Sequence, residues 1–138
     1  MITLSRRYRF PAAHVLAHPA LSDDENERIY GKCANPAGHG HDYGLEITVA
    51  GEVDPGSGQV FPRERLDALV DERVLARFGH CLLNDDPAFA ERVPTAENIA
   101  LVIEALLAAE IARQPGARLV RVRLEETRKN AFETGVLS

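Results

Sequence analysis

Apolar and polar residues alternate near the start of the chain with the period of a half-buried strand. Successive side chains of a strand point to opposite faces, so apolar residues at every second position share one face. Four such residues in the segment 2–10 are Ile2, Leu4, Tyr8 and Phe10. The same parity continues through Ala12 to His14, so we expect the strand to reach this histidine.

Two further alternating runs predict a second and a third strand. The apolar positions are Leu45, Ile47 and Val49 in one run and Val120, Val122 and Leu124 in the other. Residues 131–134 are predicted to return beside the third strand as a short fourth. The segment from about residue 17 to residue 38 is rich in Asp, Glu, Asn and Gly, and we expect it to be a loop.

Two segments show instead the three- and four-residue spacing of amphipathic helices. The first begins after Pro62, which suits a first helical turn, and should stop near Gly79. The second begins at Thr95, which offers a capping hydroxyl, and ends before Pro115. Their apolar residues are Leu66, Leu69, Val70 and Val74 in the first helix and Ile99, Val102, Ile103, Leu106, Leu107 and Ile111 in the second.

The order of these elements is two strands, two helices and two strands. It favours an α+β fold in which a four-stranded antiparallel sheet has both helices on one face. A chain of 138 residues builds one core comfortably, so residues 1–138 are predicted to form a single domain. A sheet this small leaves open edges that neighbouring subunits can cover, and we expect an oligomer.

Composition and charge narrow the choice of partners. Hydrophobic residues make up 45% of the chain and charged residues 27%, as in ordinary globular proteins. The net charge is −5 and no run of Lys or Arg is long, which argues against nucleic acid as a partner. No segment approaches the ~20 apolar residues of a membrane span, and the N-terminus lacks the apolar stretch of a signal peptide. We expect a cytoplasmic protein without a membrane partner.

Three of the five histidines share a pattern that suits a metal ion. His39 and His41 are two residues apart, so in an extended chain both rings point to the apolar side of the second strand. His14 ends the first strand on its own apolar side. If the strands pair, the three rings converge, and three imidazoles with an open fourth position are typical of catalytic Zn²⁺. The alternative is a polar His-Gly-His turn and a hydrogen-bonded core histidine, because such short motifs also occur by chance.

Two more residues are candidates for proton transfer. Cys33 lies in a polar loop that leads directly to the histidine pair, where nearby Zn²⁺ and Lys32 would lower its pKa and make it a general base. The alternative for Cys33 is a small hydrophobic residue in a loop. His80 follows the predicted end of the first helix, and it is equally well explained as a residue favoured by the helix dipole.

Glu126 continues the parity of the third strand, so a carboxylate should reach the buried face. Burial without a partner is costly, and two carboxylate oxygens suit the paired N–H donors of a flat heterocycle with an amidine-like edge. The alternative is an ion pair with Arg128 or Lys129. Glu97, which is also acidic, can instead be explained as a first-turn residue stabilised by the helix dipole.

Together these residues resemble the 6-pyruvoyl-tetrahydropterin synthase and 6-carboxytetrahydropterin synthase family. The matching stretches are 10–14, 33–43, 80–85, 95–98 and 126–127, which follow the family's order over nearly the whole chain. The stretch 33–43 is the most specific. Its five residues between Cys33 and His39 resemble the pyruvoyl branch, since this spacing is often shorter in the carboxy branch.

The resemblance implies the tunnelling fold, with trimers that form a barrel and stack into a homohexamer with sites between subunits. It also implies a zinc-dependent lyase acting on 7,8-dihydroneopterin triphosphate, by triphosphate elimination or side-chain cleavage. In this scheme Cys33 is the base, His80 is its catalytic partner and Glu126 anchors the pterin ring. Thr95 and Glu97 lie near the substrate.

One departure from the family concerns the residue before His80. Relatives usually carry Asp-His where this chain has Gly79-His80, so the carboxylate that orients the histidine is missing. Asp85 and Asp86 are candidate substitutes, and Gly79→Asp should raise turnover unless residue 79 requires a positive φ. Three alternatives remain: a 6-carboxytetrahydropterin synthase of queuosine biosynthesis, a zinc hydrolase of another heterocycle, and a non-catalytic pterin-binding zinc protein.

Overall fold

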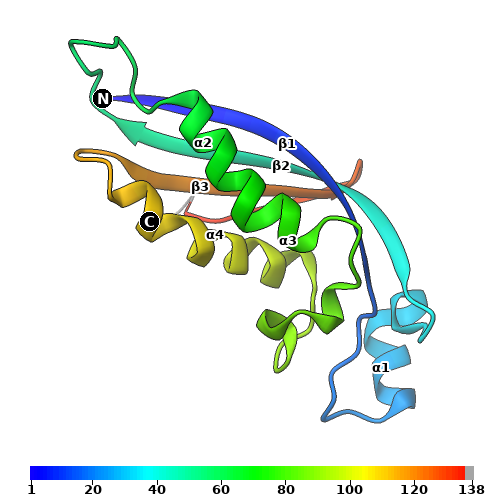
Figure 1. Ribbon diagram of the computed structural model, residues 1–138. Helices are drawn as coiled ribbons and strands as arrows, with labels where there is room; N and C mark the ends of the chain where they lie inside the picture. Colours follow the sequence, from blue (N-terminus) through cyan, green and yellow to red (C-terminus); the bar gives the residue numbers. More distant parts are fainter. Residues whose placement is uncertain (136–138) are drawn as a thin grey trace.

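The computed structural model describes residues 1–135, so the last three residues of the predicted domain lie outside the described part. Within it, four strands form one antiparallel sheet in the order β1-β2-β3-β4 (Figure 1). They are β1 (Ile2–His14), β2 (His39–Gly51), β3 (Arg118–Thr127) and β4 (Asn130–Glu133). The first three include the segments predicted from alternation, β4 ends one residue before the predicted Thr134, and the α+β fold is confirmed.

Two helical segments cover the same face of this sheet, as Figure 1 shows. The first is a continuous run of α2 (Arg63–Val70), a π-helical turn η2 (Asp71–Leu75) and α3 (Ala76–Phe78). The second is α4 (Ala96–Ala112), whose first turn is capped by the Thr95 hydroxyl. Both begin and end close to the predicted residues. No helix within residues 1–135 combines the length and apolar character needed to cross a membrane.

The π-helical turn keeps the apolar residues of the first helical segment on one face. The residues that it aligns are Leu66, Val70, Val74 and Phe78, all fully buried. They recur at every fourth position, and in a regular α-helix each such step drifts by about 40° around the axis. A π turn has more residues per turn, so it reduces this drift in the middle of the segment.

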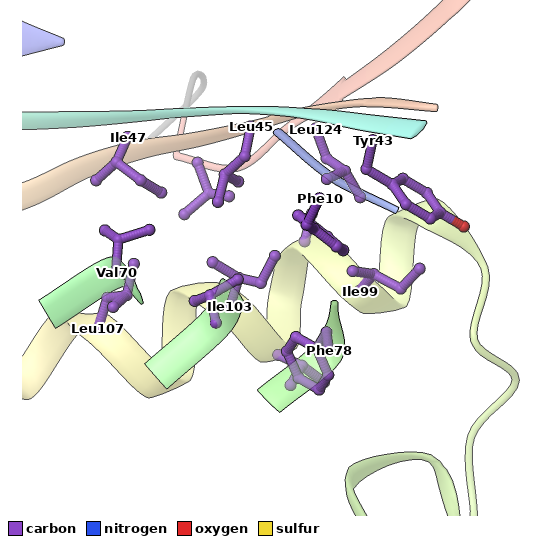
Figure 2. Close-up of a cluster of buried hydrophobic side chains, with 14 of the residues drawn as sticks. Phe10, Tyr43, Leu45, Ile47, Val70, Phe78, Ile99, Ile103, Leu107 and Leu124 are labelled. Carbon is purple, nitrogen blue, oxygen red and sulfur yellow. The ribbon is translucent and has the colours of Figure 1, made fainter. Parts of the chain in front are cut away.

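The core lies between the sheet and the two helical segments (Figure 2). Phe10 and Tyr43 stack with ring centroids 5.2 Å apart, on the side of the sheet that faces α4. Ile99 and Ile103 of α4 pack beneath them. This packing fixes which side of β2 is buried, and therefore the direction in which the neighbouring histidines point.

A helix missed by the sequence analysis lies between the first two strands. Residues 17–38 were expected to be a loop, but they contain α1 (Asp23–Tyr30) and the 3₁₀ helix η1 (Gly31–Ala34). A capping box starts α1, in which Ser22 and Glu25 each accept a hydrogen bond from the other's backbone amide. The helix has no apolar stripe, so hydrophobic periodicity gave no signal, and the Ser-x-x-Glu pattern was the available clue.

The connection between α3 and α4 runs along the outer edge of β1. The amide of His80 donates to the carbonyl of Pro11 (2.6 Å), and the amide of Ala13 donates to the carbonyl of Cys81 (2.9 Å). The chain then turns into the 3₁₀ helices η3 (Leu83–Asp85) and η4 (Pro87–Phe89). This connection covers the end of β1 next to the histidines.

Candidate metal centre

Three histidine rings meet where β1 ends and β2 begins. The antiparallel register pairs His14 with His39 and Ala12 with His41, so all three rings lie on the helix-facing side of the sheet. The Nε2 atoms of His14 and His39 are 3.0 Å apart. One ligand atom from each histidine lies within 4.8 Å of the other two. These residues can hold a metal ion, as the parity of the two strands indicated.

The hydrogen bonds of His14 leave one ring nitrogen available to a metal. Its Nδ1 lies 2.9 Å from the carbonyl oxygen of Pro94, which can only accept, so Nδ1 carries the proton. The lone pair of Nε2 then faces His39, in the manner of a metal ligand oriented through its other nitrogen. The ring is fully buried, and burial lowers the pKa of His14 to about 4. It is therefore neutral near pH 7.

Two other nitrogens of this cluster are buried and have no hydrogen-bond partner within the described residues. They are Nδ1 of His39 and Nε2 of His41. Such orphaned polar atoms are rare in native proteins and need an explanation. Burial also lowers the pKa of His41, against the opposing effect of Glu126. A bound cation would give the orphaned His41 nitrogen a partner, so the residues present fit a metal ion.

Tyr43 belongs to the site, although the sequence analysis did not select it. Its side chain is fully buried, and its hydroxyl lies 3.3 Å from Nδ1 of His14. Burial raises the pKa of Tyr43, and the nearby Glu126 and Cys33 raise it further. Both acidic groups therefore lie within electrostatic range of the same phenol. The sequence did contain a signal for Tyr43: residues 39, 41 and 43 occupy every second position of one strand, so their side chains point to the same face.

Glu126 lies on the histidine side but is half-buried, so the expectation of a buried carboxylate is met only in part. The pairing of β3 with β4 shifts register between Glu125 and Thr127. This irregularity interrupts the strict alternation on which the expectation of burial was based. No ion pair joins Glu126 to Arg128 or Lys129 in residues 1–135, so the alternative partners are not used there.

Cys33 lies in η1 and is half-buried. Its carbonyl oxygen accepts a hydrogen bond of 2.7 Å from the amide of Leu16, two residues after His14. The loop that carries the thiol is thus tied to the end of β1. Cys33 and Glu126 both lie within electrostatic range of Tyr43, whose ring contacts the rings of His14 and His41.

His80 lies apart from this group, at the outer edge of β1. Its ring is exposed and takes part in none of the hydrogen bonds found between residues 1 and 135. Together with His41 and Asp42 it lines a cavity of about 510 Å³. Its backbone has a φ of 60°, which is uncommon for a residue with a Cβ atom. No described contact joins His80 to Cys33.

The two aspartates proposed to orient His80 do not contact it in the described part of the chain. Asp86 accepts two hydrogen bonds from Arg77, at 2.9 and 2.7 Å, and a third from the amide of Ala88. The guanidinium lowers the pKa of Asp86, which is therefore fully engaged. Asp85 is exposed.

The N-terminus of α4 lies beside the histidines, because Pro94 holds His14. Thr95 follows directly, and its hydroxyl accepts a hydrogen bond of 3.2 Å from the amide of Asn98. Glu97 is exposed in the first turn, the position where a carboxylate is stabilised by the helix dipole. Both residues therefore have structural explanations at this helix end.

Comparison with known proteins gives a consistent answer. A family model described as 6-pyruvoyl tetrahydropterin synthase matches residues 3–135. A 6-pyruvoyl tetrahydrobiopterin synthase of Pongo abelii is 41% identical over 128 residues, which cover 92% of this chain and 86% of the relative. The protein of the same name from Poecilia reticulata is 39% identical over 128 residues, covering 92% and 85%.

A solved structure extends this likeness to the fold. The 6-pyruvoyl tetrahydropterin synthase of Caenorhabditis elegans is 38% identical to this chain and superposes with a TM-score of 0.88. The alignment covers 96% of this chain and 93% of that one, so the similarity extends over nearly the whole fold. The chain belongs to the 6-pyruvoyl tetrahydropterin synthase family.

Proposed function

We propose that this protein is a zinc-dependent lyase that acts on 7,8-dihydroneopterin triphosphate and releases triphosphate. The observation that carries the proposal is the cluster of three histidines beside Tyr43, with a thiol and a carboxylate within electrostatic range of the same tyrosine. Membership of the family supports the choice of substrate. The relatives named 6-pyruvoyl tetrahydrobiopterin synthase support the pyruvoyl branch over the carboxy branch.

His14, His39 and His41 would hold the zinc ion. Zinc bound there would act as a Lewis acid that polarises the hydroxyl oxygens of the pterin side chain. The chain prepares the ligands by burying His14 and by holding its Nδ1 on the Pro94 carbonyl. Three imidazoles leave a fourth coordination position open to substrate.

Glu126 and Cys33 would act on the two ends of the substrate. The half-exposed carboxylate of Glu126 can accept two N–H donors from the pterin ring while remaining accessible. The thiolate of Cys33 would remove a proton from a side-chain carbon, and the electron pair left behind would expel triphosphate from the adjacent carbon. His80 would return a proton to the product. Thr95 and Glu97 remain predicted contacts near the substrate.

The separation of His80 from Cys33 supports a site completed between subunits. Outside the connection that covers its end, β1 has no backbone hydrogen bonds along its outer edge in residues 1–135. Open edges of this kind favour pairing with another copy. We therefore propose a homohexamer built from two trimers, in which the His80 edge of one subunit approaches the thiol of a neighbour. The cytoplasmic location remains a prediction.

One observation favours a second candidate, a pterin-binding zinc protein without turnover. No acidic side chain within residues 1–135 is hydrogen-bonded to His80, and Gly79 stands where relatives usually have Asp. An imidazole without an orienting carboxylate loses much of its efficiency in proton transfer. This candidate keeps the zinc ligands and Glu126 but predicts no chemical change in the pterin.

Incubation of the purified protein with 7,8-dihydroneopterin triphosphate distinguishes these functions. Released triphosphate together with a pyruvoyl side chain, detected by mass spectrometry, is the expected result. A shortened side chain would indicate the carboxy branch, and tight pterin binding without product would indicate the second candidate. Metal analysis should find about one zinc per chain, and a His39→Ala, His41→Ala double variant should lose it. Full zinc occupancy in that variant would rule out the assigned ligands.

A further inference from the structure

The carboxamide of Asn84 holds the backbone of the residue that follows His14. The amide of Val15 donates to Oδ1 of Asn84 at 2.8 Å, and Nδ2 of Asn84 donates to the carbonyl of Val15, also at 2.8 Å. A carboxamide offers one acceptor and two donors, so it can replace a peptide group of a neighbouring strand. Asn84 thus pairs with the residue that directly follows β1, although it lies 69 residues away from it along the chain.

The hydrogen bonds of Asn84 continue a row of backbone hydrogen bonds between residues 80–82 and the edge of β1. Residues 80–82 bond to Pro11 and Ala13 through their backbone and form a parallel bridge to β1. At residue 83 the chain turns into η3, so no backbone remains to meet the next position on the edge, Val15. The Asn84 side chain supplies the missing pair of hydrogen bonds. It therefore fixes the register between the His80 segment and the end of β1.

The residue after Val15 connects this strand end to the loop that carries the Cys33 thiol. Leu16 follows Val15, and its amide donates to the carbonyl of Cys33 at 2.7 Å. Three consecutive residues consequently make three different attachments: His14 to the histidine cluster, Val15 to Asn84 and Leu16 to the thiol loop. Loss of the central attachment would free the backbone between a metal ligand and the proposed base.

We propose that Asn84 is a positioning residue that sets the placement of His14 relative to Cys33 within one subunit and anchors the segment carrying His80 to the same strand end. The inference rests on the proposed function, since it takes the roles of these three residues from there. Both hydrogen bonds of the Asn84 side chain go to the backbone of Val15, so Asn84 acts on His14 and Cys33 through the backbone.

The test compares Asn84→Ala with Asp86→Ala in the full-length protein. Asp86 belongs to the same connection and loses two hydrogen bonds to Arg77 when replaced, but it has no contact with Val15. Hydrogen exchange, resolved to single amides by mass spectrometry, reports on Val15 and Leu16 without requiring metal or substrate. In Asn84→Ala both amides should exchange about tenfold faster or more, whereas Asp86→Ala should leave both nearly unchanged.

Zinc affinity and steady-state kinetics give two further readouts. Zinc should bind about 10- to 100-fold more weakly to Asn84→Ala than to Asp86→Ala, as when the supports of metal ligands are removed. The kcat should fall while KM stays nearly constant, because Asn84 is not among the residues proposed to bind the pterin. An unchanged Leu16 exchange rate, or zinc affinity equal in the two variants, would overturn the proposal. A wild-type protein without turnover would refute the proposed function, while the exchange rates would still decide the role of Asn84.

Discussion

At the scale of single residues, His80 combines an exposed imidazole with a left-handed backbone. In this region a Cβ atom crowds the backbone, at a cost of roughly 1–2 kcal/mol that glycine avoids. Backbone conformations that cost free energy are concentrated at functional sites. The strain at residue 80 is therefore an argument for a chemical role that the sequence, which explained His80 equally well as a helix-end residue, did not contain.

Replacing His80 separates the strain from the chemistry. Compared with His80→Ala, the His80→Gly variant should be about 1 kcal/mol more stable, because both lack the ring and only alanine keeps the strained Cβ. Both variants should lose most of the turnover. Urea unfolding measures the stability difference, and triphosphate release measures the turnover. Equal stability of the two variants would show that φ at residue 80 is not strained in solution.

The low pKa of His14 has a consequence for the stability of the metal-free protein. In the unfolded chain this imidazole titrates near pH 6.5, whereas in the folded state its pKa is about 4. Between these values the unfolded state binds a proton that the folded state does not, so stability should fall as pH is lowered. The loss should reach up to about 1.4 kcal/mol per pH unit.

Unfolding of chelator-treated protein between pH 7 and pH 4.5 measures this slope. His14→Gln cannot take up the proton and should show a shallower dependence. A slope that is the same in the variant and the wild type would mean that His14 does not contribute.

At the scale of elements, the alternation of apolar and polar residues was sufficient to predict the three long strands. Helical periodicity was sufficient to predict α4 and the helical run that ends at Phe78. The histidine cluster could also be predicted, because parity along β1 and β2 fixes the direction of each ring once the strands pair. The contacts that the carbonyl of Pro94 and the side chain of Asn84 make with this region could not be predicted. They meet the end of β1 across 80 and 69 residues of chain, and such contacts leave no local pattern.

The end of α3 shows how a helix terminus limits what can be changed. Gly79 has a φ of −61°, so the condition attached to Gly79→Asp in the sequence analysis is satisfied. A Cβ atom there would nevertheless lie 2.6 Å from the carbonyl oxygen of Leu75, which already accepts a hydrogen bond from the Gly79 amide. Backbone atoms cannot move aside as a flexible side chain does, so the helix end must shift.

We therefore expect Gly79→Asp to lower stability by about 1–3 kcal/mol, as overpacking does, and not to raise turnover. Gly79→Ala is the matched control, since it adds the Cβ atom without the carboxylate. The two variants should be similarly destabilised in urea unfolding. An active and stable Gly79→Asp variant would show that the helix end adapts and that only the carboxylate was missing.

At the scale of the whole molecule, self-association should use the edges of the sheet. The face opposite the helices carries paired charges, among them Arg7 with Glu46 at 2.9 Å and Arg9 with Asp42 at 3.0 Å. Such a face offers little apolar surface to bury, whereas the edge of β1 offers unpaired backbone groups. Light scattering at micromolar concentration should give a mass well above twice the 15.2 kDa of one chain. A mass of one chain would contradict the proposed assembly.

The connection at residues 80–84 also acts as a stop for any strand that docks against β1. It occupies the edge from Pro11 onward, so a neighbouring strand can pair only with residues 2–10. Nine residues of extended chain span about 30 Å, which sets the longest overlap that two subunits can share. In the proposed assembly this connection would limit how far one copy can slide along another, and strand pairing between subunits would end before the histidines.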